Sequence, residues 1–290
     1  MSLIRHEELV SEDKVVSTAL TFIVLTGLFA SVGYYLLIEL GIKRHFMATF
    51  MWSPALAAFA TCLIRGINIR SLAWGLGPTR WVWTSYLIPV VYGLIAYGII
   101  WLGGFGSVVD PQFIHEVGAF LGLSGWSDTA VVLIAFLMFG VIGLIWRLGA
   151  VIGEEIGWRG FLTPVLLQKF SFPVTSLIVG VVWALWHLPI LLYTKYNAGP
   201  QDIELQVLNY TVMTVGVSFI LTYVYQRSRS IWTASLLHAA HNAFILSVLD
   251  PMTLKYEESW RYTGEFGFVL PYVILAFGLV FWYRANREAK

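Results

Sequence analysis

The sequence predicts an all-α fold, a polytopic membrane helix bundle of about eight transmembrane helices with a polar intramembrane cavity. Of the 290 residues, 58% are hydrophobic and only 12% are charged, and the mean hydropathy is +0.74. Soluble domains carry about 25% charged residues, so much of this surface is expected to face lipid. Long apolar stretches recur along the chain, and several contain ionisable residues. Burying such a residue in lipid is costly, which points to an interior cavity.

Eight apolar stretches approach or exceed the roughly 20 residues that a helix needs to cross a bilayer. They lie near residues 17–40, 46–64, 82–103, 128–156, 174–193, 205–226, 231–249 and 267–284. Between the third and the fourth, residues 104–127 contain no Lys or Arg but have apolar residues at helical spacing, which predicts an interfacial helix. Without an internal repeat or linker, we interpret residues 1–290 as a single integral-membrane domain.

The distribution of Lys and Arg predicts the topology, because cytoplasmic connections carry an excess of both. Twelve of the 18 fall on one side of the expected helices and five on the other, while Arg147 lies inside the fourth helix. The asymmetry predicts an integral protein of the cell (inner) membrane, with the Met1 and Lys290 termini both in the cytoplasm.

Charge and cysteine content exclude other classes. The net charge is only +1 and no basic patch is present, so we expect no nucleic-acid partner. Cys62 is the single cysteine and lies in an apolar run, so the chain has no intramolecular disulfide and no thiolate metal cluster.

Two adjacent acids, Glu154 and Glu155, lie near the end of the fourth expected helix. Neighbouring residues on a helix point about 100° apart, so the two carboxylates are expected to have different roles. Glu155 and Arg159 are spaced i, i+4 with the acid first, which favours an ion pair and leaves Glu154 free to face a cavity. Alternatively, both carboxylates reach the lipid headgroups and merely end the helix.

Two further apolar helices carry imidazole and amide groups. His187 follows Trp183 by one turn in the fifth helix, and His238 precedes Asn242 by one turn in the seventh. A lone histidine in an apolar helix is usually a satisfied core residue, and the alanines around His238 also allow close helix packing. Three helices that each carry such polar groups are better explained by one water-filled site.

Other membrane-protease patterns fit poorly. The sequence His115–Glu116 is not followed by the second His of an H-E-x-x-H zinc motif. Residues 122–125, Gly-Leu-Ser-Gly, are similar to the nucleophile turn of rhomboid serine proteases, but a four-residue match of this kind is common by chance. Intramembrane aspartyl proteases need paired Asp residues on two spans, which this sequence lacks.

Three motifs resemble the CPBP family of intramembrane glutamic endopeptidases, which includes the Rce1-like CAAX prenyl proteases and bacteriocin-processing or immunity relatives. They are E-E-x-x-x-R, aromatic-x-x-x-His, with Trp where the prenyl endopeptidases often have Phe, and His-x-x-x-Asn. They occur in the family's order on the fourth, fifth and seventh helices, within a family core of residues 153–242. Their residues are Glu154, Glu155 and Arg159; Trp183 and His187; and His238 and Asn242.

The resemblance implies a hydrolase in which Glu154 and His187 activate a water while His238 and Asn242 hold the carbonyl oxyanion. The Glu155–Arg159 pair would orient the site. His241, outside the motifs, is expected to have a minor or structural role.

The implied reaction is metal-independent, glutamate-dependent cleavage of membrane-associated peptides or protein tails, either CAAX-type or in bacteriocin processing, with no cofactor. Its partners would be the lipid bilayer and a peptide or lipidated-protein substrate. Two alternatives stay open: a non-catalytic immunity or scaffold protein that binds peptides, and a zinc-dependent protease using Glu154, His187, His238 and His241.

Overall fold

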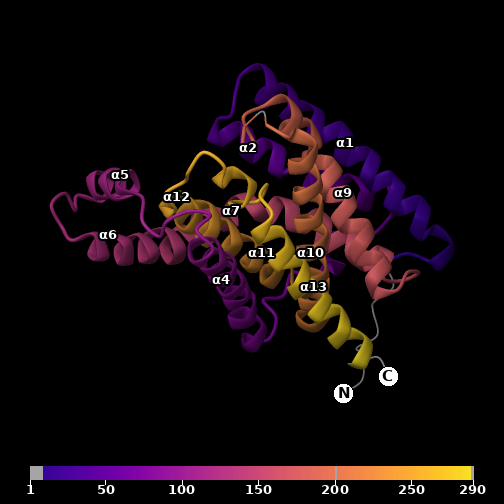
Figure 1. Ribbon diagram of the computed structural model, residues 1–290. Coiled ribbons are helices and arrows are strands. Elements are labelled where there is room, and N and C mark those ends of the chain that lie inside the picture. Colours follow the sequence, from indigo (N-terminus) through magenta and orange to yellow (C-terminus); the bar gives the residue numbers. More distant parts are fainter. Residues whose placement is uncertain (1–8, 200, 289–290) are drawn as a thin grey trace.

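The computed structural model describes residues 9–199 and 201–288, so Met1 and Lys290, on which the predicted position of the termini depends, lie outside the described residues. Within these ranges every regular element is a helix, and the only β-type pairing is one bridge between Ser107 and Leu254. This confirms the all-α fold class (Figure 1).

The α-helices follow in chain order, numbered α1 to α13. They are α1 (Val15–Glu39), α2 (Arg44–Met51), α3 (Ser53–Arg65), α4 (Thr79–Leu102), α5 (Pro111–Leu121), α6 (Asp128–Ala135), α7 (Gly143–Glu155), α8 (Thr163–Leu166), α9 (Phe172–Tyr193), α10 (Ile203–Ser228), α11 (Ile231–His241), α12 (Asp250–Met252) and α13 (Val269–Glu288). Three π-helical segments interrupt or extend them: η3 (Phe136–Ile142), η4 (Ile156–Leu162) and η5 (Asn242–Leu249). Short 3-10 turns form η1 (Glu12–Lys14), η2 (Ile69–Ser71) and η6 (Ser259–Arg261).

Seven helices of the described chain are long and apolar enough to cross a membrane, one fewer than the eight predicted. They are Glu12–Glu39, Arg44–Arg65, Thr79–Leu102, Asp128–Leu166, Phe172–Tyr193, Ile203–Ser228 and Val269–Glu288. The expected helix at 231–249 does form, as part of the continuous run of α11, η5 and α12, but it is not one of the seven. Its two histidines and its asparagine lower its apolarity, and it is shielded by α4, α7 and α10, which pack against it.

The fourth helix is longer at its C-terminal end than we predicted. We expected it to end near residue 156, at the polar cluster, but the helical run continues to Leu166 and spans 39 residues. Glu155 and Arg159 are fully buried and paired with each other, so the cluster does not mark the exit to water that its charges indicated.

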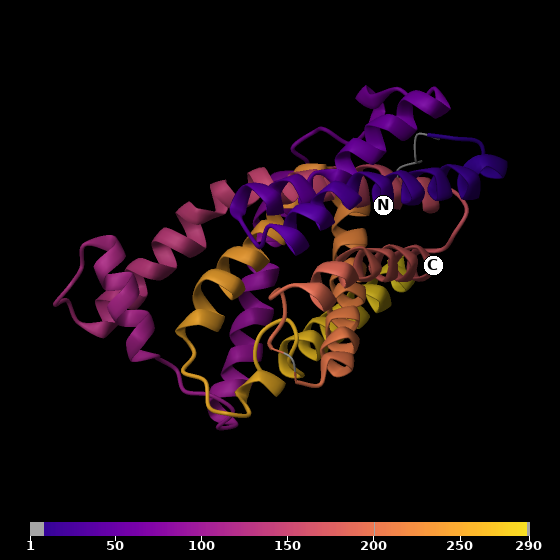
Figure 2. The same ribbon diagram turned by 90° about the horizontal axis from the view of Figure 1, so that it is seen from above.

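A helix also forms in the connection where one was predicted. Asp110 caps α5, its carboxylate accepting a hydrogen bond of 2.8 Å from the Gln112 backbone amide, and Gly122 ends the helix with a left-handed φ of +72°. Helices α5 and α6 extend away from the other helices in both views (Figures 1 and 2). The placement of α5 at the membrane surface stays a prediction.

Small residues allow the helices around the site to approach closely. Helix α10 packs against both α9 and α13. At the α10–α13 crossing, a Cβ on Gly278 would lie 2.6 Å from the Gly216 carbonyl oxygen, so only glycine fits there. Helix α10 is thereby held between α13 and α9, and α9 carries Trp183 and His187.

Candidate active site

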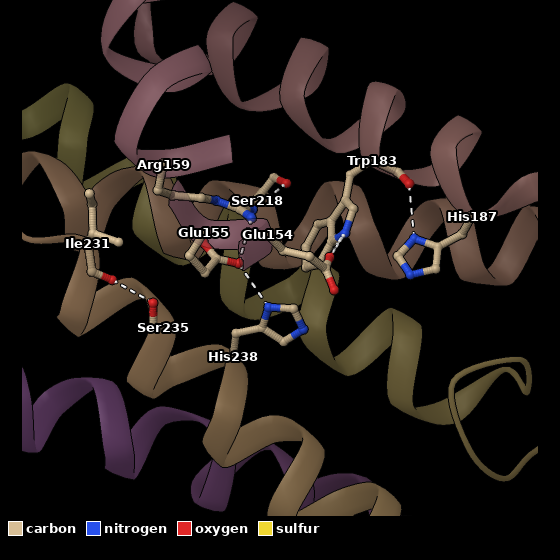
Figure 3. A network of polar contacts seen from close by, with 9 residues as sticks. All are labelled: Glu154, Glu155, Arg159, Trp183, His187, Ser218, Ile231, Ser235 and His238. Atoms are coloured by element: carbon tan, nitrogen blue, oxygen red, sulfur yellow. Dashed lines mark hydrogen bonds and ion pairs between the residues drawn. The ribbon is translucent and has the colours of Figure 1, made fainter. Parts of the chain in front are cut away.

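A cavity of about 250 Å³ lies among α2, α7, α9, α10 and α11. All four predicted catalytic side chains line it: Glu154, His187, His238 and Asn242. The cavity thus collects groups from three helical runs that are far apart in sequence. Figure 3 shows three of the four, Asn242 excepted, with their polar contacts.

Glu154 is 1% exposed at the end of α7, and its Oε2 accepts a hydrogen bond of 2.7 Å from the indole nitrogen of Trp183 on α9. The sequence indicated that Trp183 and His187 lie on the same face of one helix, but it did not indicate the hydrogen bond from Trp183 to Glu154. The indole fixes one oxygen of the carboxylate and so orients the group in the cavity wall (Figure 3).

Glu155 points away from Glu154 and does not line the cavity. Its Oε1 accepts from Arg159 Nη1 at 3.1 Å, so the predicted ion pair is present, and both side chains are fully buried. Arg159 also donates to Ser218 Oγ at 3.0 Å and lies over the Trp183 ring, 4.6 Å from its centroid. Through the contacts of Arg159 with Trp183 and Ser218, the pair links α7 and η4 to α9 and α10.

The same Glu155 oxygen lies 2.8 Å from His238 Nδ1, a contact that sequence spacing did not indicate. A carboxylate that is paired with Arg159 can only accept, so His238 Nδ1 donates. For His238 to donate from Nε2 into the cavity as well, its ring must carry protons on both nitrogens. The Glu155 carboxylate stabilises this imidazolium cation electrostatically. Glu155 thus orients the His238 ring toward the cavity.

His187 is held in a defined tautomer. Its Nδ1 lies 3.1 Å from the Trp183 carbonyl oxygen, which can only accept. In the neutral ring, Nε2 then keeps its lone pair and can accept a proton. This arrangement suits a group that shares the proton of a water molecule.

Asn242 follows His238 by one turn and begins the π-helix η5, just as η4 begins directly after Glu155. Short π-helical segments inside α-helices often occur at functional sites. Among the residues that the structure describes, two of the three π segments adjoin residues of the predicted site.

His241, which lies outside the three motifs, lines the cavity together with Asn242. Its Nδ1 is 2.8 Å from the Tyr92 hydroxyl, and its Nε2 is 3.1 Å from Glu265 Oε1. Both ring nitrogens are engaged, which is compatible with the structural role predicted for it.

Sequence reasoning missed Glu265 and assigned no role to Arg147, both of which line the cavity. Glu265 lies in the turn before α13, where no helical spacing connects it to His241. The only local signal was an acid next to the aromatic Phe266 in a short glycine-containing segment. Arg147 was visible as an intramembrane cation.

Within residues 9–199 and 201–288, no three His, Cys, Asp or Glu side chains are grouped so that they could hold a metal ion. Metal independence itself stays a prediction.

The fold and the cavity define a helical integral membrane protein with buried carboxylate, imidazole and amide groups. Residues 133–244 match the family model described as type II CAAX prenyl endopeptidase Rce1-like. All three motifs lie inside the match, so residues 133–244 are similar to the family from which the resemblance was drawn. Whether residues 1–290 form a single domain with a core at 153–242 stays a prediction.

The chain is also similar to CAAX prenyl protease 2 of Methanococcus maripaludis. The two are 29% identical over 155 residues, which cover 52% of this chain and 52% of that protein. The match therefore spans about half the length of the relative.

Proposed function

We propose that this protein is an intramembrane, metal-independent and glutamate-dependent endopeptidase. One observation carries the proposal: Glu154, His187, His238 and Asn242, identified from sequence motifs, line one buried cavity. The Rce1-like match over residues 133–244 supports the same class of activity.

In the proposed reaction, the Glu154 carboxylate accepts a proton from a water molecule, and His187 Nε2 accepts a hydrogen bond from the same water. The resulting hydroxide oxygen forms a bond to the peptide carbonyl carbon. His238 and Asn242 donate hydrogen bonds to the negative oxygen of the tetrahedral intermediate, in a site where low dielectric strengthens each bond. Glu154 then returns its proton to the peptide nitrogen as the carbon–nitrogen bond breaks.

The Glu155–Arg159 pair serves as a positioning unit in this proposal. Neither residue lines the cavity, but Glu155 holds the ring of the lining residue His238 through the 2.8 Å contact to its Oε1. Loss of the pair would therefore misplace an oxyanion donor and also destabilise the fold.

The proposed substrates are membrane-associated peptides or protein tails. Much of the cavity wall is apolar, formed by Met47, Met51, Met213, Val217 and Leu246 among others, which suits a segment that enters from the lipid phase. The relative's name points to CAAX-type prenylated tails. Processing of bacteriocin-like peptides is the other substrate class that we propose to test.

We also propose that the protein lies in the cell (inner) membrane with both termini in the cytoplasm. The excess of Lys and Arg on one side of the expected helices supports this orientation.

The test uses the purified full chain in detergent with two substrate sets, a randomised peptide library and farnesylated peptides that end in a CAAX sequence. We expect cleavage by the wild type and its loss in Glu154→Gln, since the amide is nearly isosteric but cannot accept the proton. Glu116→Gln is the matched control, because Glu116 is an exposed acid on α5 outside the cavity. Activity that survives in Glu154→Gln, or peptide binding without cleavage by the wild type, would contradict the proposal.

A further inference from the structure

Arg147 is an intramembrane cation that the proposed reaction does not use. It lies on α7 seven residues before Glu154, and both side chains line the same cavity. Ala150 and Val151 line it too, so the four residues at i, i+3, i+4 and i+7 occupy one face of α7. Arg147 and the proposed catalytic residue Glu154 therefore share one wall of the cavity.

The fold does not neutralise Arg147 by direct contact with an acid. Its Nη2 donates to Ser247 Oγ on η5 at 2.7 Å. It forms no ion pair with any residue that the structure describes. Glu265 also lines the cavity, but its carboxylate is bound to His241 Nε2.

A guanidinium at membrane depth is costly, so such residues are usually paired or serve function. Arg147 carries five N–H donors in a planar fork, and a carboxylate is the group whose geometry fits two of them at once. The cavity is therefore equipped to bind an anionic group of a ligand beside the proposed catalytic acid.

We propose that Arg147 is a specificity-determining residue that binds a carboxylate of the peptide substrate. The inference rests on the proposed function and adds that the preferred substrates share a carboxylate group. The carboxylate belongs either to the C-terminus of the peptide or to an Asp or Glu side chain, and the experiment below separates these sources.

Helix geometry sets the distance between the carboxylate and the cleaved bond. Seven residues of α-helix rise about 10 Å, and an extended peptide covers about 3.3 Å per residue. A substrate lying along this face of α7 would place its carboxylate about three residues from the bond at Glu154. The wall between the two sites is formed by the small side chains of Ala150 and Val151, which leave room for a peptide.

An anionic lipid headgroup is another conceivable ligand for Arg147. A peptide carboxylate fits the observations better, because Arg147 lines the same cavity as Glu154, His187 and His238. A lipid bound there would occupy the path of the substrate.

The experiment compares three quenched decapeptide libraries on purified full chain. The first lacks Asp and Glu and ends in a free carboxylate; the second is the same library with an amidated C-terminus; the third is amidated but contains Asp and Glu. We expect the wild type to cleave the first or the third with a kcat/KM roughly 10- to 100-fold above the second, the range for a charge-assisted hydrogen bond. The preferred library identifies the source of the carboxylate.

Arg147→Gln should reduce this ratio to near 1 and still cleave the second library. Arg147→Met, which keeps the stem length and removes all polarity, decides the question if Arg147→Gln does not fold. Arg65→Gln is the matched control, since Arg65 is exposed and bonded to Ser17 and Thr21 outside the cavity; it should keep the wild-type ratio. Equal cleavage of all three libraries by the wild type, or an unchanged ratio in the Arg147 variant that folds, would overturn the inference. So would an equal loss of rate on all three libraries, which would point to a lipid ligand or to packing.

Binding of the same libraries to Glu154→Gln separates this inference from the proposed function. A preference for carboxylate peptides that disappears in Glu154→Gln combined with Arg147→Gln supports the carboxylate site even if the wild type cleaves nothing. Cleavage without any such preference supports the peptidase and rejects the carboxylate site.

Discussion

Glu155→Gln should destabilise the protein more than Glu154→Gln, although the two acids are adjacent and almost equally buried. Glu155 Oε1 accepts from both Arg159 and His238, at 3.1 and 2.8 Å, whereas Glu154 accepts from the neutral indole of Trp183. Neutralising Glu155 leaves the fully buried Arg159 guanidinium without a counter-charge. Neutralising Glu154 leaves a hydrogen bond that an amide oxygen can still accept.

The expected magnitude follows from those contacts. Removing one partner of a buried ion pair costs about 3 to 5 kcal/mol. The Gln amide oxygen retains part of the hydrogen bonding, so we expect a value near 3 kcal/mol for Glu155→Gln, and about 1 kcal/mol or less for Glu154→Gln. At about 2 to 4 °C per kcal/mol, the Tm of Glu155→Gln should fall by roughly 6 to 12 °C.

The assay is thermal unfolding in detergent, followed by tryptophan fluorescence and paired with peptidase activity. Glu155→Gln combined with Arg159→Met should recover part of the lost stability, because the unpaired buried charge is removed. If the two single variants are equally stable and Glu155→Gln alone is inactive, the roles of the two acids are reversed. If the double variant is less stable than Glu155→Gln, the buried charge is not the source of the cost.

Three further predictions concern the oxyanion donors, the metal and the topology. Asn242→Ala should lower kcat by about 10² to 10³ at nearly unchanged KM, because Asn242 donates to a charge that is present only in the transition state. In the same steady-state assay His241→Ala should have a mild effect. If His241→Ala is the more damaging change, the oxyanion role was assigned to the wrong residue of this helix. Chelation should leave activity unchanged, whereas activity lost on chelation and restored by zinc would establish a metal enzyme. Cysteines replacing the exposed Lys169 and Glu257, in a background with Cys62→Ala, should react with an impermeant maleimide from opposite sides of the membrane; labelling from the same side would refute the predicted orientation.

The sequence was sufficient for features that depend on composition or on spacing within one helix. Apolarity over whole stretches predicted the membrane bundle, because lipid selects apolar side chains at every exposed position of a span. The Glu155–Arg159 pair was predictable because an i, i+4 spacing determines neighbours on a helix. Local spacing did not show where the fourth helix ends, since a buried pair and a pair at the membrane surface have the same sequence pattern.

Only the tertiary structure decided which groups complete the site. Glu155 and His238 are 83 residues apart, Glu154 and Trp183 are 29 apart, and His241 and Glu265 are 24 apart. No periodicity connects such pairs, because their distances depend on how separate helices cross. The sequence by itself determined which polar residues must avoid lipid, since that cost belongs to each residue; the packing of α7, α9 and α11 determined which of them meet.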